Sequence, residues 1–450
     1  MKSAVKKLSV CVLVFAFSPA SWAIPQIEQW ETANGARVLF VAAPEIPMVD
    51  VKVVFDAGSA RDGEKSGLAA LTNNLLDEGA GDKSADQMAE SFESLGAVVG
   101  HAADRDMATL SLRSLNDPAL LQPALENLAL SYSQPRFEAE AFKRVQQQTL
   151  AIIEQSAQTP GSVAAHAFYR ALYDKHPYAS PVEGTTSSVS ALTPEEIRMF
   201  HKHYYVAKNA VIAIVGALDK TQAEALANTL TKQLPTGEPA SSLPAPQDLT
   251  APQTVHIQHP STQTHVLLGQ LGVSRHDPDY FPLYVGNYVL GGGGFVSRLL
   301  KQVREKRGLA YSAASYFAFQ QVAGTFVASL QTRNDQTAQA LAVAQGVLKD
   351  FVENGATEAE LKAAKQHLIG GFPMKIDSNR EILEYLAMIG FYRMPLDHLQ
   401  NFTKKIDAVT LEQIKTAYQK RFHLDKFITL TVGNEESKAV VKPEVEKSGK

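Results

Sequence analysis

The chain has 450 residues, among them 43 Lys and Arg, 47 Asp and Glu and one cysteine, and its formal net charge is −4. A net negative charge argues against nucleic acid as a partner, because binding to phosphates depends on an excess of basic side chains. A single cysteine excludes an intramolecular disulfide and a thiolate metal site. On length alone, we expect more than one domain, each with a sizeable core.

Residues 1–23 have the pattern of a secretory signal peptide. Lysines at the start are followed by an apolar run at 8–17 and by small residues before a cleavage site at Ala23. No later segment offers the roughly 18 uncharged apolar residues that a membrane span needs. We therefore expect export to the periplasm and no membrane partner. Cleavage would also remove Cys11, the only cysteine.

Beyond the signal peptide, runs with strand and helix patterns alternate in mixed order. Residues 51–57 and 109–115 read as strands, whereas residues 68–76, 119–132 and 140–155 read as helices. This order favours an α+β fold with mixed or antiparallel sheets over a doubly wound α/β fold.

The sequence repeats one unit. Residues 193–216 align without a gap to residues 410–433. Each copy begins with a Thr-x-x-Glu/Gln capping box and ends in an apolar strand closed by glycine. The same unit therefore closes each half of the chain, which indicates an internal duplication.

A segment rich in Pro, Ser and Ala, residues 236–253, separates the two halves and is predicted to be an exposed linker. The predicted domains are therefore residues 24–235 and residues 254–450.

The second half contains the most informative segment, residues 291–311, which predicts a glycine loop, an amphipathic helix, a glycine stop and a strand. The helix spacing predicts that one buried face consists of Val296, Leu299, Leu300 and Val303. Arg304 lies off that face, and Gly308 ends the helix as a left-handed cap. The strand then begins near Tyr311. We expect the Arg304 guanidinium and the Tyr311 hydroxyl to approach each other and to donate to one carbonyl.

Composition alone would describe this segment as a connector followed by a solvated, basic helix end. Four consecutive glycines also suggest a phosphate-binding loop, but no Gly-Lys-Ser/Thr follows them, so that interpretation fails.

The segment closely resembles the C-terminal-domain signature of the pitrilysin, insulinase and mitochondrial processing peptidase family, in which a Gly-rich turn, Ser-Arg-Leu, Arg-Glu-Lys, Gly-Leu and Tyr follow in this order. The resemblance spans nearly the whole mature chain. It implies two similar domains that face each other like a clamshell. It also implies that Arg304 and Tyr311 bind the backbone of a peptide substrate opposite the zinc.

The zinc motif of that family, His-x-x-Glu-His on a helix of the first domain, is degenerate in this chain. After Gly67, where the motif should start, Ala70 and Asn74 replace the two histidines and Asn73 replaces the glutamate. Amide side chains do not substitute for imidazole ligands, and Asn73 cannot accept a proton from water. Glu154 falls near the expected third ligand. We therefore expect no metal and no catalytic residue in this chain alone.

Other histidines offer no substitute zinc site. We expect His201 and His203 to be solvated or to cap a helix. We expect His256, His259 and His265 to lie at the surface or at a strand edge. The spacing of His101, Asp104 and Asp106 matches no standard metal loop.

Two functions remain open. The chain is either the zinc-less subunit of a periplasmic, heterodimeric peptidase, with zinc in a homologous partner, or an inert structural or chaperone-like member of the same family. Arg304 and Tyr311 favour the first, because a purely structural chain has no chemical need for both. Three replaced motif positions argue against an independently active enzyme.

Overall fold

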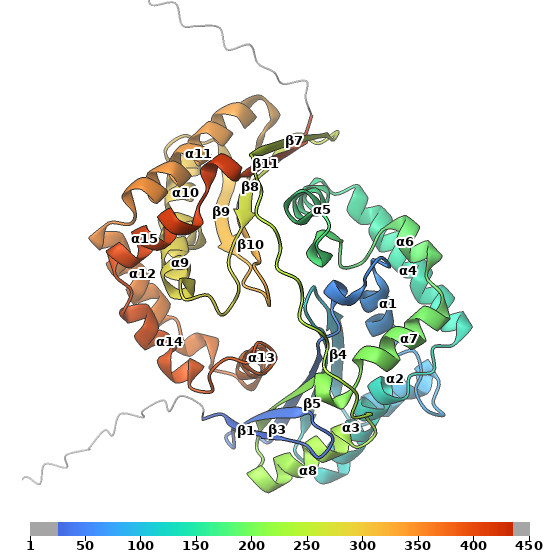
Figure 1. The fold of residues 1–450 in the computed structure, drawn as a ribbon. Helices are drawn as coiled ribbons and strands as arrows, with labels where there is room; N and C mark the ends of the chain where they lie inside the picture. Colours follow the sequence, from blue (N-terminus) through green and yellow to red (C-terminus); the bar gives the residue numbers. More distant parts are fainter. Residues whose placement is uncertain (1–25, 435–450) are drawn as a thin grey trace, which may run out of the picture.

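The computed structural model describes residues 26–434, so the predicted signal peptide and Cys11 lie outside the described residues. The chain forms two halves, each a β-sheet with helices packed on it, and Figure 1 shows the halves facing each other like two shells. The predicted α+β fold is confirmed. Within residues 26–434, no helix is both long and apolar enough to cross a membrane.

The sheet of the first half has six strands in the order β1-β2-β6-β3-β5-β4. The strands are β1 (Glu28–Glu31), β2 (Arg37–Ala42), β3 (Met48–Phe55), β4 (Val98–Ala103), β5 (Ala108–Leu115) and β6 (Ala210–Gly216). The central strand β6 is buried along its whole length, and its continuous apolar sequence fits that position. By contrast, β4 lies at the edge of the sheet and is exposed along almost all of its length.

The sheet of the second half has five strands in the order β7-β11-β8-β10-β9. The strands are β7 (Gln253–Gln258), β8 (Gln263–Leu271), β9 (Ala310–Phe317), β10 (Thr325–Arg333) and β11 (Ile428–Gly433). Here β7 and β9 are the edge strands, and β9 corresponds to β4 of the first sheet.

The two sheets have the same topology apart from the additional β1. In the first, β6 pairs parallel to β2 and antiparallel to β3. In the second, β11 pairs parallel to β7 and antiparallel to β8. Both predicted capping boxes are present, at Thr193 with Glu196 and at Thr410 with Gln413. The repeated sequence unit therefore forms the same helix and central strand in each half.

The helices also correspond between the halves. Those of the first half are α1 (Leu68–Asn74), α2 (Ala85–Glu93), α3 (Pro118–Ser133), α4 (Ala139–Ala157), α5 (Pro160–Tyr173), α6 (Thr186–Ala191), α7 (Pro194–Tyr204) and α8 (Lys220–Thr231). Those of the second half are α9 (Tyr280–Asn287), α10 (Arg298–Leu300), α11 (Thr337–Asn354), α12 (Glu358–Gly370), α13 (Asn379–Phe391), α14 (His398–Asp407) and α15 (Leu411–Arg421). In chain order, α3 to α7 match α11 to α15.

One helix of each half packs on the sheet of the other half. Helix α5 lies against β8 and β11, and α13 lies against β2, β3 and β6 (Figure 1). The contacts are close: a Cβ on Gly269 would lie 2.7 Å from Phe168 Cζ, and a Cβ on Gly390 would lie 2.5 Å from Val211 Cγ1. This exchange of α5 and α13 closes the open face of each sheet and fixes the two halves relative to each other.

The segment between the halves, residues 232–252, lies along the first half, and we call it the strap. No helix or strand lies between α8 and β7, which begins at Gln253. Arg61 Nη1 donates to the Ser241 carbonyl at 2.7 Å, and His176 Nε2 donates to the Pro244 carbonyl at 3.0 Å. The strap is exposed along much of its length, as predicted for a linker, but side chains of the first half hold it in place.

Candidate functional site

The predicted glycine loop, helix, glycine stop and strand are all present in the second half. A π-helical turn, Tyr288–Gly292, continues from α9, and a short helical stretch then runs through α10 and Lys301–Glu305 to β9. Gly308 has φ of +63°, so it is the predicted left-handed cap, and its N–H donates to the Arg304 carbonyl at 2.8 Å.

One residue of the predicted buried face lies elsewhere. Leu299, Leu300 and Val303 are buried, but Val296 is 50% exposed, so its prediction was wrong. The reason is the helix start: Ser297 caps α10 by accepting the Leu300 N–H at 3.4 Å, and Val296 therefore lies outside the helix. It belongs to a separate 3₁₀ turn.

Arg298 ties this segment to the helices behind it. Its guanidinium donates to Glu360 at 2.7 and 2.8 Å, to Asp350 at 2.9 Å and to the Gly355 carbonyl at 2.9 Å. Burial alone would raise the pKa of Glu360, but the hydrogen bonds from Arg298 and Thr357 lower it to about 2. Arg298 thus has a structural role, because its donors are already bound to acceptors of the second half.

Arg304 stacks against two aromatic rings at the start of β9. Its guanidinium carbon lies 4.7 Å from the Tyr311 ring centroid and 5.3 Å from the Phe295 ring centroid. Tyr311 is 80% exposed and Phe295 is 67% exposed. Cation–π contact holds the Arg304 and Tyr311 side chains together while the guanidinium N–H groups and the phenol hydroxyl stay available as donors. The sequence predicted that Arg304 and Tyr311 lie at one site, but it did not predict the contact between Arg304 and Phe295.

In the first half, helix α1 carries the degenerate zinc-motif positions. Asp62 caps this helix, because its carboxylate accepts the N–H groups of Gly67 and Ala69, each at 2.7 Å. Ala70 is buried, Asn73 is completely buried and Asn74 is half-buried. The helix predicted from the sequence is therefore present, and its inward side chains are an alanine methyl and an amide.

The amide of Asn73 is part of a hydrogen-bonded group that includes an edge-strand histidine. Asn73 Nδ2 donates to the Thr109 carbonyl at 3.5 Å, and His101 Nδ1 lies 3.2 Å from Asn73 Oδ1. On its other side, His101 Nε2 lies 3.3 Å from Asp77 Oδ2. The hydrogen bond to Asp77 raises the pKa of His101. Two acceptors on opposite ring nitrogens favour an imidazolium at this position.

The residues of this site do not fit zinc. Alanine and two asparagines stand where the motif requires two imidazoles and a carboxylate, and Glu154 is exposed on α4. In the part of the chain that the structure describes, no three His, Cys, Asp or Glu side chains come together as metal ligands.

Among the remaining histidines, His201 was predicted to be solvated or to cap a helix, and it is not solvated. It stacks on Tyr205 with ring centroids 4.9 Å apart, and its Nε2 donates to the Tyr132 carbonyl at 2.8 Å. Burial lowers the pKa of His201 to about 4. His203, by contrast, is exposed. The neutral imidazole of His201 is a packing element.

A buried carboxylate joins the two halves at their seam. Asp106, which is 2% exposed, accepts hydrogen bonds from Tyr178 in the first half and from Tyr392 and the Gln321 N–H in the second, the last two at 2.9 and 3.1 Å. Burial raises the pKa of Asp106. The sequence had raised Asp106 only as part of an unsupported metal loop, because nothing local indicates partners more than 200 residues away.

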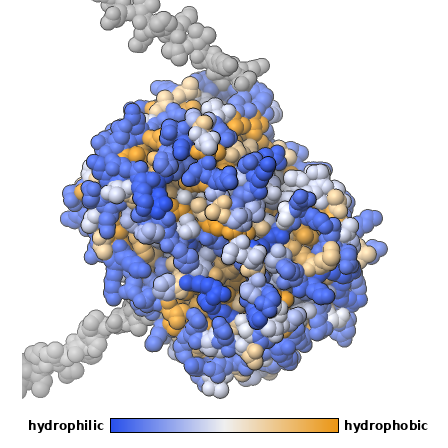
Figure 2. Space-filling model, in the orientation of Figure 1, coloured by the Kyte–Doolittle hydropathy of each residue, from blue (hydrophilic) through white to orange (hydrophobic). Residues whose placement is uncertain are grey.

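A cavity of about 770 Å³ opens beside this seam, between the halves. Arg105 lines it from the first half, and Arg275, Tyr280 and Tyr316 line it from the second, together with the glycines that precede α10. Figure 2 shows hydrophobic residues along the hollow between the halves, whereas much of the surrounding surface is hydrophilic. The cavity is large enough for several residues of an extended peptide.

Two sequence families match the chain over most of its length. Residues 37–186 match the family described as "Insulinase (Peptidase family M16)", and residues 191–368 match the one described as "Peptidase M16 inactive domain".

Individual relatives match along nearly the whole chain. The crystal structure of a peptidase M16 inactive domain from Pseudomonas fluorescens is 40% identical, covers 91% of this chain and 98% of its own, and superposes with a TM-score of 0.88. The uncharacterized zinc protease YmxG of Bacillus subtilis is 24% identical over 409 residues, which is 90% of this chain and 98% of that protein. The non-peptidase homolog YmxG of Helicobacter pylori is 24% identical over 371 residues, or 82% of this chain and 85% of its own length.

Proposed function

Because the chain belongs to the insulinase family of peptidases, M16, and lacks the side chains of a zinc site, we propose that it is the substrate-binding subunit of a two-chain peptidase. The zinc belongs to a homologous partner subunit. The chain binds peptide substrates and supplies Arg304 and Tyr311 to the shared site. The predicted signal peptide supports a periplasmic location for the complex.

The pair formed by Arg304 and Tyr311 carries this proposal. Both side chains are fixed by stacking, yet neither forms a hydrogen bond or ion pair with another residue among those described at 26–434. Donors held in place without an acceptor suit a peptide carbonyl, and more strongly the oxyanion that develops on it during cleavage.

The edge strands support binding of extended peptides. Both β4 and β9 leave one side of their backbone without a strand partner, and both lie at the edge of their sheet. Such an edge pairs with an added strand through main-chain hydrogen bonds, which suits substrates of varied sequence. Tyr311 is on β9, so a peptide at that edge would pass the Arg304 and Tyr311 donors.

The test is activity of a complex assembled from this chain and a homologue from the same genome that retains His-x-x-Glu-His. Arg304→Ala and Tyr311→Phe should each leave assembly and zinc content unchanged but lower kcat on a short unstructured peptide by about 100-fold or more. Arg307→Ala is the matched control, because Arg307 is exposed and bonds only to Gln302 of its own segment.

The isolated chain is the second arm of this test. It should contain no stoichiometric zinc and cleave no peptide. Wild-type turnover in both Arg304→Ala and Tyr311→Phe complexes would remove the pair from the mechanism and favour an inert structural or chaperone-like role. Chelator-sensitive cleavage by the isolated chain would refute the proposal.

A further inference from the structure

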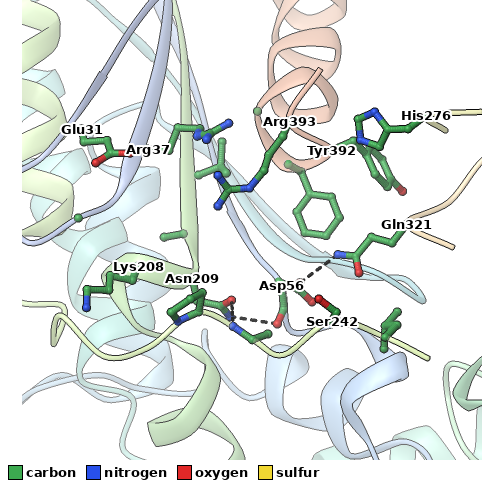
Figure 3. A pocket seen from close by; sticks show the side chains of 18 of the residues that line it. Glu31, Arg37, Asp56, Lys208, Asn209, Ser242, His276, Gln321, Tyr392 and Arg393 are labelled. Carbon is green, nitrogen blue, oxygen red and sulfur yellow. Dashed lines mark hydrogen bonds between the residues drawn. The ribbon is translucent and has the colours of Figure 1, made fainter. Parts of the chain in front are cut away.

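A second cavity, of about 420 Å³, lies at the seam between the halves and is distinct from the Arg304 and Tyr311 site. Strands β2 and β6 of the first half, the strap and the end of α13 all contribute to its wall (Figure 3). Its volume lies within the range of small-molecule sites. None of the residues that we assign to peptide binding lines it.

Two arginines from different halves face each other in this cavity. Arg37 is on β2, Arg393 follows α13, and Figure 3 shows both side chains extending into the same part of the pocket. Burial and the nearby charge of Arg393 lower the pKa of Arg37. Within residues 26–434, neither guanidinium forms an ion pair or a hydrogen bond. Two like charges held together without a carboxylate between them form a site for an anion.

The backbone at Arg393 is held in an unfavourable conformation that keeps its side chain at this position. Its φ is +51°, in the left-handed region that non-glycine residues seldom adopt. The N–H of Arg393 donates to the Gly390 carbonyl at 3.3 Å, and the next N–H, of Met394, donates to the Ile389 carbonyl at 2.9 Å. Together these bonds make Arg393 the left-handed residue that ends α13, so the end of the helix fixes where the Arg393 side chain enters the cavity.

The other polar groups of the cavity compensate the charge of the arginine pair only in part. Lys208 pairs with Glu238, and Asp56 pairs with Arg61 and accepts from Gln321. Glu31 is the remaining carboxylate of the lining; it lies opposite Arg37 in the β1–β2 register and raises the pKa of Arg37 less than burial and Arg393 lower it.

We propose that this cavity binds a small oxyanion, a carboxylate or phosphate compound, between Arg37 of the first half and Arg393 of the second. Planar guanidinium groups bind both kinds of oxyanion through paired N–H donors. Because the two arginines belong to different halves, a bound anion links them and stabilises the folded chain.

The proposal is tested by calorimetric titration of the full mature chain with inorganic phosphate and, separately, with citrate, at constant ionic strength in chloride. At least one probe should bind saturably with one equivalent, and the tighter probe identifies the ligand class. Arg37→Gln and Arg393→Gly should each weaken that binding by about tenfold or more. Arg307→Gln, which removes the same charge elsewhere, should not.

Arg393→Gly also controls for folding. Glycine accepts the positive φ, so the thermal midpoint without ligand should stay the same or rise, while the increase in midpoint that the anion produces in wild type should be lost. Absence of saturable binding of both probes to wild type would overturn the proposal. Binding that persists at full strength in both Arg37→Gln and Arg393→Gly would overturn it as well.

Discussion

The segments that lead to the two edge strands differ in what they offer a ligand, although they belong to equivalent sheets. In the first half, Asn73, which the resemblance aligns with the glutamate of the zinc motif, is completely buried and hydrogen-bonded to Thr109 and His101. In the second half, Tyr311 is 80% exposed beside Arg304. The first segment has become part of the core, whereas the second still presents donors to solvent.

In the first half, the polar side chains at this site bond to one another. The Asn73 amide contacts the His101 imidazole, and the imidazole contacts Asp77, which together form a stabilising network. Four predictions test how far each half tolerates change, and they run from the largest expected effect to the smallest.

The two glycines at the contacts of the exchanged helices should tolerate a side chain unequally. A Cβ on Gly269 would meet the Phe326 carbonyl oxygen at 2.2 Å, and backbone in a sheet cannot move aside. Gly269→Ala should therefore lower the free energy of unfolding by about 3 kcal/mol. At Gly390 the contacts are side-chain ends of Val211 and Leu39, and alanine favours the helix, so Gly390→Ala should change it by less than about 1 kcal/mol. Urea denaturation of the full chain measures both, and equal losses would contradict the assignment.

Restoring the zinc motif should not restore an enzyme. The combined change Ala70→His, Asn73→Glu and Asn74→His places a carboxylate at a completely buried position, and Glu154 is exposed on α4. We expect the free energy of unfolding to fall by about 2 kcal/mol, with no chelator-sensitive peptide cleavage. Asn74→His alone, at a half-buried position, is the control. Stoichiometric zinc together with turnover in the triple variant would show that the first half kept a latent metal site.

The ion pair between Arg298 and Glu360 in the second half should lose its stabilising effect at acid pH. Because Glu360 has a pKa of about 2 against an ordinary 4.5, its stabilisation is present above pH 4.5 and is lost as the pH falls toward 2. Glu360→Gln should lower the free energy of unfolding by about 2 kcal/mol at pH 7 and by progressively less below pH 4.5. Glu358→Gln, in the same helix but exposed, should show no such dependence. A pH-independent difference for Glu360→Gln would contradict the ion pair with Arg298.

The stabilisation that His101 contributes to the first half should have the opposite pH dependence and weaken as the pH rises. The pKa of His101 is raised above 6.5 by Asp77, so its contribution is complete below pH 6.5 and disappears as the pH rises through the folded-state pKa. His101→Gln should lower the free energy of unfolding by less than about 1 kcal/mol at pH 5.5 and by nearly nothing at pH 9. His203→Gln, at an exposed position, serves as the comparison. A larger loss at pH 9 than at pH 5.5 would exclude an imidazolium bound to Asp77.

Local patterns in the sequence predicted the features that depend on neighbouring residues. The α+β fold, the capping boxes at Thr193 and Thr410 and the left-handed glycine at Gly308 follow from spacing and backbone preference alone. The helix start was harder, because Val296 fits the apolar periodicity, yet Ser297 caps the helix after it and leaves Val296 exposed.

Features that depend on distant residues were not predictable from one sequence. His101 reaches Asn73 because β4 packs beside α1, and Asp106 meets Tyr392 across 286 positions of the chain. Neither partner has a local signature. The buried stacking of His201 on Tyr205 was missed for a related reason, since the packing of neighbouring elements buries its imidazole.

The exchange of α5 and α13 bears on the history and folding of the chain. These helices occupy the same place in the order of their halves, and each covers the other's sheet. Reciprocal exchange of equivalent elements is the geometry of a swapped homodimer with two-fold symmetry. A gene for one half, duplicated and fused, would give this molecule, with the strap converting a bimolecular encounter into an intramolecular one. The face of the first sheet is then covered only after α13 has been synthesised, so we expect the chain to fold as a single unit. Its two halves, produced as separate polypeptides, should reassemble at a rate that depends on their concentrations.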